Sequence, residues 1–164
     1  LTYIETDPKY GNQIIDTLTI VFLSFGGLGV VLPTYINAIN SIEERKTAKI
    51  ENTIKLIDRW DDPHLFQARK FTRDLKSKRS GISDDDLLEQ INKNSELHQS
   101  LLLVLNYFDS IRTSLKTKRV DTKIIKGTLE GVIKDIIERF RPFLDKQSQK
   151  FNDDINELLN LLND

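Results

Sequence analysis

A stretch of uncharged residues near the N-terminus constrains most strongly what this chain can fold into. Between Asp16 and Glu43 the sequence carries no charged side chain. That span is longer than the roughly 20 residues a helix needs to cross the hydrocarbon core of a bilayer. Its centre, IVFLSFGGLGVVL over 20–32, has one polar side chain, Ser24, whose hydroxyl can bond back to its own helix. The pattern predicts a transmembrane helix over 14–40.

Two other kinds of segment can be this apolar. A secretory signal peptide starts with basic residues and ends at a small-residue cleavage site. Here YIETDPKYGNQ is mixed in charge, and no A-x-A pattern follows. A core helix of this length carries polar residues along one face, whereas every face is apolar over 20–32. The pattern therefore favours a membrane span, with a buried or oligomer-core helix as the alternative. Tyr10 and Tyr35 are placed near the two interfaces, where aromatic rings are favoured.

Small residues occupy the middle of the span. Gly26, Gly27 and Gly29 are followed by Pro33. Glycine and proline are more frequent in membrane helices than in soluble ones, so ordinary membrane-helix composition accounts for them. They are also the candidate residues for close helix–helix packing or a kink, although no GxxxG spacing is present in the span.

Basic residues flank the span unequally. Lys9 precedes it, and Arg45, Lys46 and Lys49 follow it. The positive-inside bias therefore predicts a single-pass membrane protein with a cytoplasmic C-terminal region. The predicted organisation is a short extracytoplasmic segment over 1–13, a transmembrane helix over 14–40, an amphipathic connecting helix over 41–60 and a cytoplasmic helical bundle over 61–164.

The chain after the span has the periodicity of helices. Over 41–60 no glycine or proline interrupts a pattern of isoleucines at steps of three or four residues or near multiples of them. Asp62 is placed to cap the next helix, with Pro63 in its first turn. Ser83 and Asp121 are cap candidates for later helices, and Pro142 ends or kinks the helix before it. The predicted class is all-α, with one N-terminal transmembrane helix followed by a cytoplasmic helical bundle.

Composition excludes several kinds of site. The chain has 24 basic and 25 acidic residues and no cysteine, so no global field draws it to nucleic acid, and thiolate sites and disulfides are excluded. With 2 histidines, an imidazole-rich metal site is not expected, and no cofactor is predicted. The run Asp84–Asp86 is interpreted as acidic residues at the positive end of a helix dipole, with a divalent-cation site as the alternative. The sequence begins at Leu1 without a methionine, which indicates that a start residue or a longer N-terminus precedes it.

Several short motifs follow one another along the chain after the span. Their residues are Arg59, Trp60, Asp62, Pro63, Arg69, Asn106, Tyr107, Phe108, Asp109, Asp121, Arg141 and Pro142. These motifs resemble those of an uncharacterised bacterial family, domain of unknown function 4760. Members of that family have an N-terminal membrane helix, a helix ending in Trp and then Asp-Pro, a central helix with Asn, two aromatics and an acid, an Asp-capped helix, and an Arg-Pro. The resemblance covers most of the chain after the span and implies an architecture without an activity.

The polar members of these motifs are interpreted as a network that specifies how the helices dock. An arginine held by a carboxylate can fix the docking of two helices, so the arginines are candidate partners of the two aspartates. Tyr107 or Phe108 is expected to pack in the core. A binding site built from the same groups is the alternative. The candidate network consists of Arg59, Asp62, Arg69, Asn106, Asp109 and Arg141.

Arg59 and His64 match the loose Arg-x4–6-His signature, which resembles that of the helical ribonucleases called HEPN proteins. In those proteins two such motifs meet across a dimer and act on RNA phosphodiesters. The plan of a membrane helix plus a helical bundle is also similar to the small membrane accessory protein of type VI-B CRISPR systems. Here the motif straddles a helix break at Asp62-Pro63, whereas the HEPN motif sits at a helix start. RNA cleavage using Arg59 and His64 is therefore kept as an alternative, with His98 as the other imidazole.

The segment ARKFTRDLKSKR is predicted to form a basic surface. A solvated helix face is the default interpretation, and contact with anionic lipid headgroups is the alternative. Nucleic acid is not expected, because few aromatic residues are interleaved for stacking. The basic residues are Arg69, Lys70, Arg73, Lys76, Lys78 and Arg79.

These features favour a non-enzymatic prokaryotic membrane protein that acts by assembly. Its expected partners are the lipid bilayer and either copies of itself, as a homo-oligomer, or the subunits of a larger membrane complex to which it is accessory. An oligomeric pore-type or defence-associated membrane effector is the alternative. Ser24, Thr34 and Asn37 are the polar side chains available to line the water path of such a pore.

Overall fold

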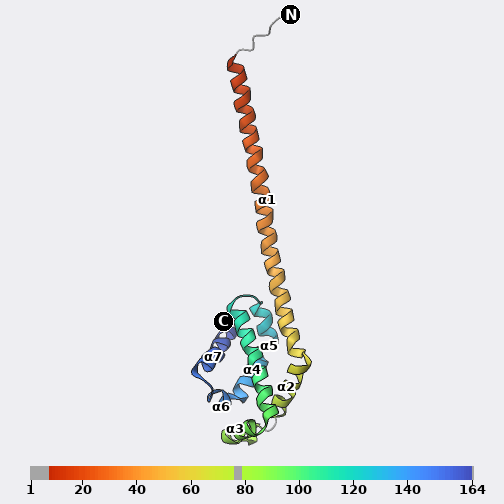
Figure 1. Cartoon of the computed structure of the whole chain (residues 1–164), viewed down its shortest axis with the longest axis vertical. Helices are drawn as coiled ribbons and strands as arrows, with labels where there is room; N and C mark the ends of the chain where they lie inside the picture. The colour runs from red at the N-terminus through yellow and green to blue at the C-terminus, as the bar shows by residue number, and fades with distance from the viewer. Residues whose placement is uncertain (1–7, 76–78, 164) are drawn as a thin grey trace, which may run out of the picture. The chain divides into compact units, whose positions relative to one another are not determined.

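Helices form nearly all of the protein. The computed structural model describes residues 8–75 and 79–163, and this part of the chain contains no strand, which confirms the all-α prediction. The chain divides into two compact units, the first ending at Lys46 and the second beginning at Thr47. In order, the helices are α1 (Pro8–Asp58), the 3-10 helix η1 (Arg59–Asp61), α2 (Pro63–Asp74), the 3-10 helix η2 (Arg79–Gly81), α3 (Asp84–Lys93), α4 (Ser95–Lys116), α5 (Thr122–Arg139), α6 (Arg141–Leu144) and α7 (Gln149–Asn163) (Figure 1).

Helix α1 runs without interruption through the segments predicted over 14–40 and 41–60. It begins at Pro8, within the segment predicted over 1–13, of which residues 1–7 lie outside the described residues. Pro33 lies inside the helix, and because it has no N–H, the Gly29 carbonyl lacks its usual donor. One residue further, the Thr34 hydroxyl donates to the Val30 carbonyl at 2.7 Å. Hydroxyl bonds of this kind are among the adjustments that let a helix continue through a proline.

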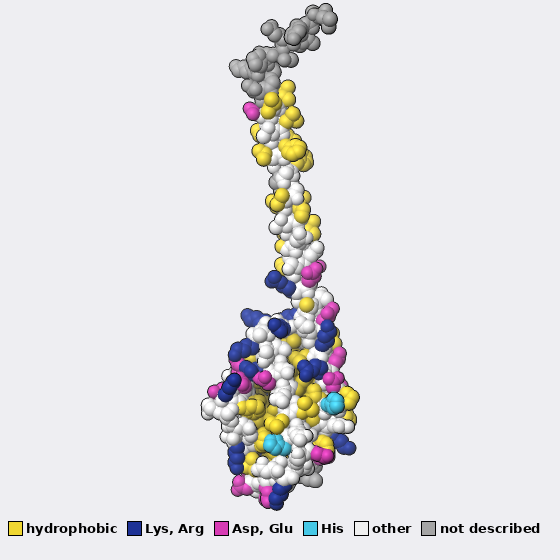
Figure 2. Space-filling model, in the orientation of Figure 1, with side chains coloured by type: hydrophobic (Ala, Val, Ile, Leu, Met, Phe, Trp, Pro, Cys, Tyr) yellow, Lys and Arg dark blue, Asp and Glu magenta, His cyan; other side chains and the backbone are white. Residues whose placement is uncertain are grey.

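The serine and threonine hydroxyls between Gln13 and Asn40 are turned back onto the helix. Each of these four hydroxyls donates to the carbonyl four residues earlier. The donors are Thr17 and Thr19 at 2.8 Å and Ser24 and Thr34 at 2.7 Å. The apolar side chains of this segment lie exposed along the helix (Figure 2). The outer surface is thus almost entirely hydrocarbon, with the polar hydrogens of these hydroxyls already bonded.

The second unit is a bundle built around α4. Helix α4 contacts α2, α3 and α7, while α5 packs against α6 and α7, and α6 also packs against α3. Removing each large apolar side chain from water stabilises the bundle by roughly 1.5–3 kcal/mol before entropy is counted. The most deeply buried large side chains are Leu87, Ile91, Leu101, Leu105, Phe108, Ile111, Ile125, Ile133, Phe140, Leu144, Leu158 and Leu162.

Helix ends in the second unit follow the predicted caps. Ser83 accepts from the Asp86 N–H at the start of α3, and Asp121 accepts from the Lys123 and Ile124 N–H groups at the start of α5. Asp62 occupies the cap position before Pro63, but its side chain accepts no capping bond. An unpredicted cap is Asn94, which separates α3 from α4 and accepts from the Leu97 N–H at 3.0 Å. These caps satisfy N–H groups that have no partner within their own helix.

The compact second unit takes in most of the segment predicted as the connecting helix. It begins at Thr47 and includes the last turns of α1, whereas the helical bundle was predicted over 61–164. Thr53, Leu56 and Trp60 are buried in it. The reason is that the isoleucine pattern over 41–60 marks a helix without telling which face is covered, and Ile50 and Ile54 are in fact exposed.

Candidate functional site

Trp60 is the centre of an aromatic cluster in the second unit. Its ring lies 5.1 Å from that of Tyr107 and 6.0 Å from that of Phe108, both in stacked geometry. The guanidinium carbon of Arg69 lies 4.7 Å from the centre of the Trp60 ring, within the range of a cation–π contact. Both Tyr107 and Phe108 are buried, where packing was expected of one or the other. Through these ring contacts, η1 packs against α4.

Tyr107 also binds the end of α1. Its hydroxyl donates to the Leu56 carbonyl at 2.7 Å. Leu56 is among the last four residues of α1, whose carbonyls lack an intrahelical donor. Burial raises the pKa of the Tyr107 phenol above its usual value, and the positive charges of Arg59 and Arg69 oppose that rise. The phenol therefore stays neutral over the ordinary pH range and acts as a hydrogen-bond donor.

Arg69 is held by a nearer acid than the sequence suggested. Its Nη2 lies 2.9 Å from Oδ1 of Asp61, not beside Asp62 or Asp109. Asp61 belongs to the same 3-10 turn as Trp60, so the arginine can stack on the ring and reach the carboxylate together. Its Nε is buried without a hydrogen-bond partner. A buried donor in this state has a free-energy cost of about 1–3 kcal/mol, which an acceptor would remove.

Arg139 is a buried cation that the sequence interpretation did not single out. The residue is 7% exposed. Its Nη1 donates to the Thr72 carbonyl at 2.8 Å and its Nη2 donates to Asp135. Its own carbonyl accepts from Arg79 Nε at 3.2 Å. Burial lowers the pKa of Arg139, Asp135 opposes this, and the charge of Arg73 lowers it further.

These groups surround a hollow of ≈ 230 Å³ between α2 and α5. Arg69 and Arg73 are four residues apart on α2 and so lie on one face of it, while Arg139 comes from the last turn of α5. Val132 and Ile136 supply the apolar part of the lining. The full lining is Trp60, Arg69, Thr72, Arg73, Val132, Asp135, Ile136 and Arg139. We call this feature the arginine hollow.

The other predicted network residues pair locally. Asp109 binds Arg112, one turn later on α4, at 2.7 Å, and Arg141 binds Asp145 on the following turn at 2.9 Å. Asn106 is exposed, and its backbone carbonyl accepts from the Ser110 hydroxyl. The six candidates therefore do not form one network, because Arg69, Asp109 and Arg141 each bind a nearer partner than those proposed.

Arg112 makes the contact between helices that Asp109 was expected to make. Besides Asp109 it reaches Asp154 at 3.2 Å and also Glu157, both on α7. Lys116 holds Glu157 from one turn further along α4 at 2.7 Å. Hydrogen bonds from Lys116 and Arg112 lower the pKa of the Glu157 carboxyl. Asp109 thus belongs to a salt-bridge cluster that joins α4 to α7.

The Arg59 and His64 pair lies at the break between η1 and α2. Both side chains are exposed, and no described residue gives either of them a hydrogen-bond or ion-pair partner. His98, near the start of α4, has its ring 5.6 Å from that of Phe143 in an edge-to-face contact. His98 therefore packs on the α6 turn.

The predicted basic surface is divided by the fold. Arg69 lies in the aromatic cluster, and Arg79 binds Asp84 and donates to the Ile82 carbonyl at 2.8 Å. Lys70 and Arg73 are exposed on α2. Lys76 and Lys78 lie outside the described residues. Of the described members, Arg73 alone both lines a hollow and has no acid or carbonyl partner among the described residues.

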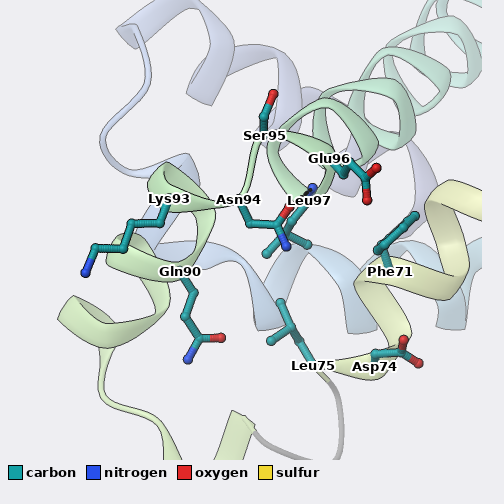
Figure 3. Close-up of a pocket in the computed structure, with 9 residues that line it drawn as sticks. All are labelled: Phe71, Asp74, Leu75, Gln90, Lys93, Asn94, Ser95, Glu96 and Leu97. Carbon is teal, nitrogen blue, oxygen red and sulfur yellow. Dashed lines mark hydrogen bonds between the residues drawn. The ribbon is translucent and has the colours of Figure 1, made fainter.

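Another hollow of the second unit has a different lining. It measures ≈ 620 Å³ and lies between the end of α2 and the junction of α3 with α4. Its lining includes the apolar side chains of Leu75 and Leu97 and the charged side chains of Asp74, Lys93 and Glu96 (Figure 3). Its charges are mixed in sign, so it presents no concentrated field to a ligand.

The predicted membrane-packing residues lie in the first unit. One helix among the described residues is long and apolar enough to cross a membrane, and none of its most apolar window is buried. A Cβ added at Gly26 or Gly29 would meet nothing within 4 Å, and Pro33 is exposed. The surroundings of Gly27 lie outside the described side chains. Gly26, Gly29 and Pro33 thus have no packing partner among the described residues, and another helix or lipid has room to contact them.

Comparison with known proteins places the chain in a family. No curated protein and no solved structure matches it. One family model matches residues 18–162, that of "Domain of unknown function (DUF4760)". The match extends from the apolar part of α1 through α7, across both units. This chain belongs to the DUF4760 family.

Proposed function

We propose that this protein is a single-pass membrane protein whose apolar α1 segment anchors a cytoplasmic helical unit that acts by assembly. The unit would assemble with copies of itself or as an accessory subunit of a larger membrane complex. One observation carries the proposal: apolar side chains are exposed on every side of the first unit. Phe22, Phe25 and Val30 are 83%, 70% and 68% exposed, and they point to different sides of the helix.

The free energy of covering these side chains indicates which environment suits them. Burial of one Leu, Phe or Val is worth roughly 1.5–3 kcal/mol. A folded partner covers one face of a helix, as the one-sided pattern of soluble helices shows. A bilayer covers all faces at once, provided that about 20 residues are apolar. The back-bonded hydroxyls of Ser24 and Thr34 reduce the cost of transfer into lipid further.

The charges at the ends of the segment support a cytoplasmic second unit. Arg45, Lys46 and Lys49 follow the apolar segment, and Lys9 alone of the basic residues precedes it. Lysine and arginine concentrate on the cytoplasmic side of membrane helices.

Two sets of uncovered residues support assembly. Gly26 and Gly29 leave open space on the apolar helix, which lets another helix approach closely. On α5 of the second unit, Ile124 and Val132 are 38% and 37% exposed, and Gly131 between them has nothing within 4 Å of an added Cβ. Contacts at either surface would bury apolar area.

Membrane fractionation tests the anchor. The full-length chain is expected in the membrane pellet after lysis without detergent and to remain there after an alkaline wash. A Leu23→Asp/Val30→Asp variant is expected to move to the supernatant, since each charge near the helix centre opposes insertion by roughly 2.5–3.5 kcal/mol. Leu23→Ile/Val30→Leu is the matched control and is expected to stay in the pellet. A wild-type chain in the supernatant would overturn the proposal.

Protease accessibility tests the orientation. In intact spheroplasts the second unit is expected to resist added protease, and to be digested once the cells are opened. Digestion in intact spheroplasts would reverse the orientation.

Cross-linking in native membranes tests assembly. The full-length chain is expected to give either a ladder of its own multiples or one defined product with another subunit. A chain that remains monomeric after cross-linking would contradict the assembly part and leave the anchor unaffected.

A further inference from the structure

The arginine hollow concentrates positive charge without a matching set of acids. Arg69, Arg73 and Arg139 line it, and among the described residues Asp135 is the only carboxylate in its lining. Asp135 is already bonded to Arg139, and the other nearby acid, Asp61, is bonded to Arg69. Three cations next to two acids leave a surplus of positive charge in a space partly enclosed by apolar side chains.

Hydrogen-bond donors are in surplus as well. A guanidinium carries five N–H donors, and among the described residues Arg69 uses one of them on a side chain and Arg73 uses none. The Arg69 Nε is buried without any acceptor. The indole N–H of Trp60, which also lines the hollow, donates to no described residue. An oxyanion supplies the acceptors that these groups lack.

The arrangement is fixed before any ligand arrives. Arg139 is anchored to the Thr72 carbonyl at 2.8 Å, which joins α5 to α2. Arg69 is held between Asp61 and the Trp60 ring. The proximity of Arg73 also lowers the pKa of Arg139, in addition to the larger effect of burial. A bound anion would relieve this repulsion.

We infer that the arginine hollow binds a phosphate-type oxyanion between Arg73, Arg69 and Arg139, against the edge of Trp60. Phosphate has several acceptor oxygens pointing in different directions, which suits fork-shaped donors arriving from two helices. A carboxylate offers two oxygens in one plane. The volume of ≈ 230 Å³ accommodates several waters of about 30 Å³ each, and therefore a phosphate group with a short attached chain. The site lies wholly in the second unit and does not depend on the proposed membrane anchor.

The ligand chemistry has two possible sources, a soluble phosphate compound and the headgroup of an acidic phospholipid. Trp60 is the only tryptophan of the chain, so its fluorescence reports on the hollow directly. The first experiment titrates full-length protein in non-ionic detergent with inorganic phosphate at constant ionic strength. A saturable change in Trp60 emission is expected, with calorimetry as an independent measure of affinity.

Two variants with the same change of charge separate the site from general electrostatics. Arg73→Gln removes an exposed, unpaired member of the lining and is expected to weaken phosphate binding about tenfold or more, because a charge-assisted hydrogen bond is lost. Lys70→Gln removes an exposed cation from the same helix outside the lining and is expected to leave the affinity unchanged. The absence of saturation, or equal weakening by both variants, would overturn the inference.

Nanodiscs distinguish the two sources. Full-length protein is placed in phosphatidylcholine discs with and without phosphatidic acid. An Arg73-dependent change in Trp60 emission with phosphatidic acid, reversed by inorganic phosphate, assigns the site to a headgroup. A response to inorganic phosphate without any response to phosphatidic acid assigns it to a soluble compound. Both outcomes support an oxyanion site, and a response in neither arm excludes it. Failure of the chain to enter discs would contradict the proposed anchor, while the detergent titration would still test the hollow.

Discussion

Replacing Thr53 by valine should weaken the tie between α1 and the rest of the bundle. Thr53 is buried, with 0% of its surface exposed. Its hydroxyl donates to the Lys49 carbonyl and accepts from the Asp121 N–H, both at 2.7 Å. Asp121 is the cap of α5, so one hydroxyl joins the last turns of α1 to the start of a helix far along the chain.

The size of the effect follows from what valine leaves unpaired. The Lys49 carbonyl keeps its intrahelical donor, so little is lost there. The Asp121 N–H is half-buried and would have no acceptor, which carries a cost of about 1–3 kcal/mol. The added methyl is buried in place of the hydroxyl, and its removal from water offsets a fraction of that cost. We expect a net destabilisation of about 1–2 kcal/mol, which lowers the melting temperature by roughly 3–8 °C for a unit of this size.

The assay follows Trp60 emission during thermal and urea unfolding of full-length protein in non-ionic detergent. Trp60 is 8% exposed and stacked on Tyr107, so unfolding of the bundle brings it into water. Thr128→Val is the matched control. Its hydroxyl also bonds back to the carbonyl four residues earlier, at 2.9 Å, but it is exposed and makes no hydrogen bond to another helix among the described residues. This control is expected to stay within about 0.5 kcal/mol of wild type.

The reasoning would be refuted if Thr53→Val and Thr128→Val changed stability by the same amount. It would also fail if hydrogen exchange at the Asp121 amide were unaffected by the Thr53 change. In either case the Thr53 hydroxyl would not connect α1 to α5 in solution.

Three further outcomes are expected from the second unit. Tyr107→Phe should lose about 0.5–1.5 kcal/mol with the bond to the Leu56 carbonyl. Because the pKa of Tyr107 is raised in the folded state, wild-type stability should fall as pH rises above the unfolded pKa of about 10. In urea unfolding, the Tyr107→Phe variant should lose less stability over this pH range than wild type. The lowered pKa of Glu157 gives the opposite pH dependence. Its contribution to stability is present above the unfolded pKa of about 4.3 and is lost as pH falls through the folded pKa. Glu157→Gln should therefore make the loss of stability in acid less steep, as followed by circular dichroism. Gly131→Ala should stabilise the bundle by about 0.5–1 kcal/mol in thermal unfolding, because alanine favours helix and meets open space; a loss of stability would show that another surface covers this face.

Much of the fold could be predicted from local sequence rules. Ser83 and Asp121 cap helices as expected, because the first N–H groups of a helix lack partners within it and a side-chain oxygen just before the helix can accept from them. The apolar segment and the isoleucine pattern after it predicted the two helical segments, over 14–40 and 41–60, through which α1 runs. Pro142 lies in the first turn of α6, just after α5 ends at Arg139. Periodicity and caps depend on neighbours within one or two turns, so they can be read without knowing the tertiary structure.

The charge pairs could not be predicted in the same way. Asp109 and Arg141 bind partners three and four residues away, because a neighbour one turn along the helix is already in reach. Arg69 binds Asp61 and not Asp62. Which of these neighbouring aspartates faces the arginine depends on the orientation of a single 3-10 turn. Arg139 was missed although it lies three residues after buried Ile136, and that spacing was the available signal. The arginine hollow needs α2 and α5 side by side, which no local rule supplies.

The length of the uncharged part of α1 has a consequence for membrane thickness. From Thr17 to Ile42 the helix is about 39 Å long at 1.5 Å per residue, against roughly 30 Å for an average hydrocarbon core. A proposed anchor of this length fits an average bilayer only by tilting, or by letting its polar end turn at Asn37 and Asn40 enter the headgroup layer. Thicker membranes would need less of either adjustment. Because each ångström of hydrophobic mismatch costs a fraction of a kcal/mol, the helix itself biases the protein toward the thicker regions of a heterogeneous membrane.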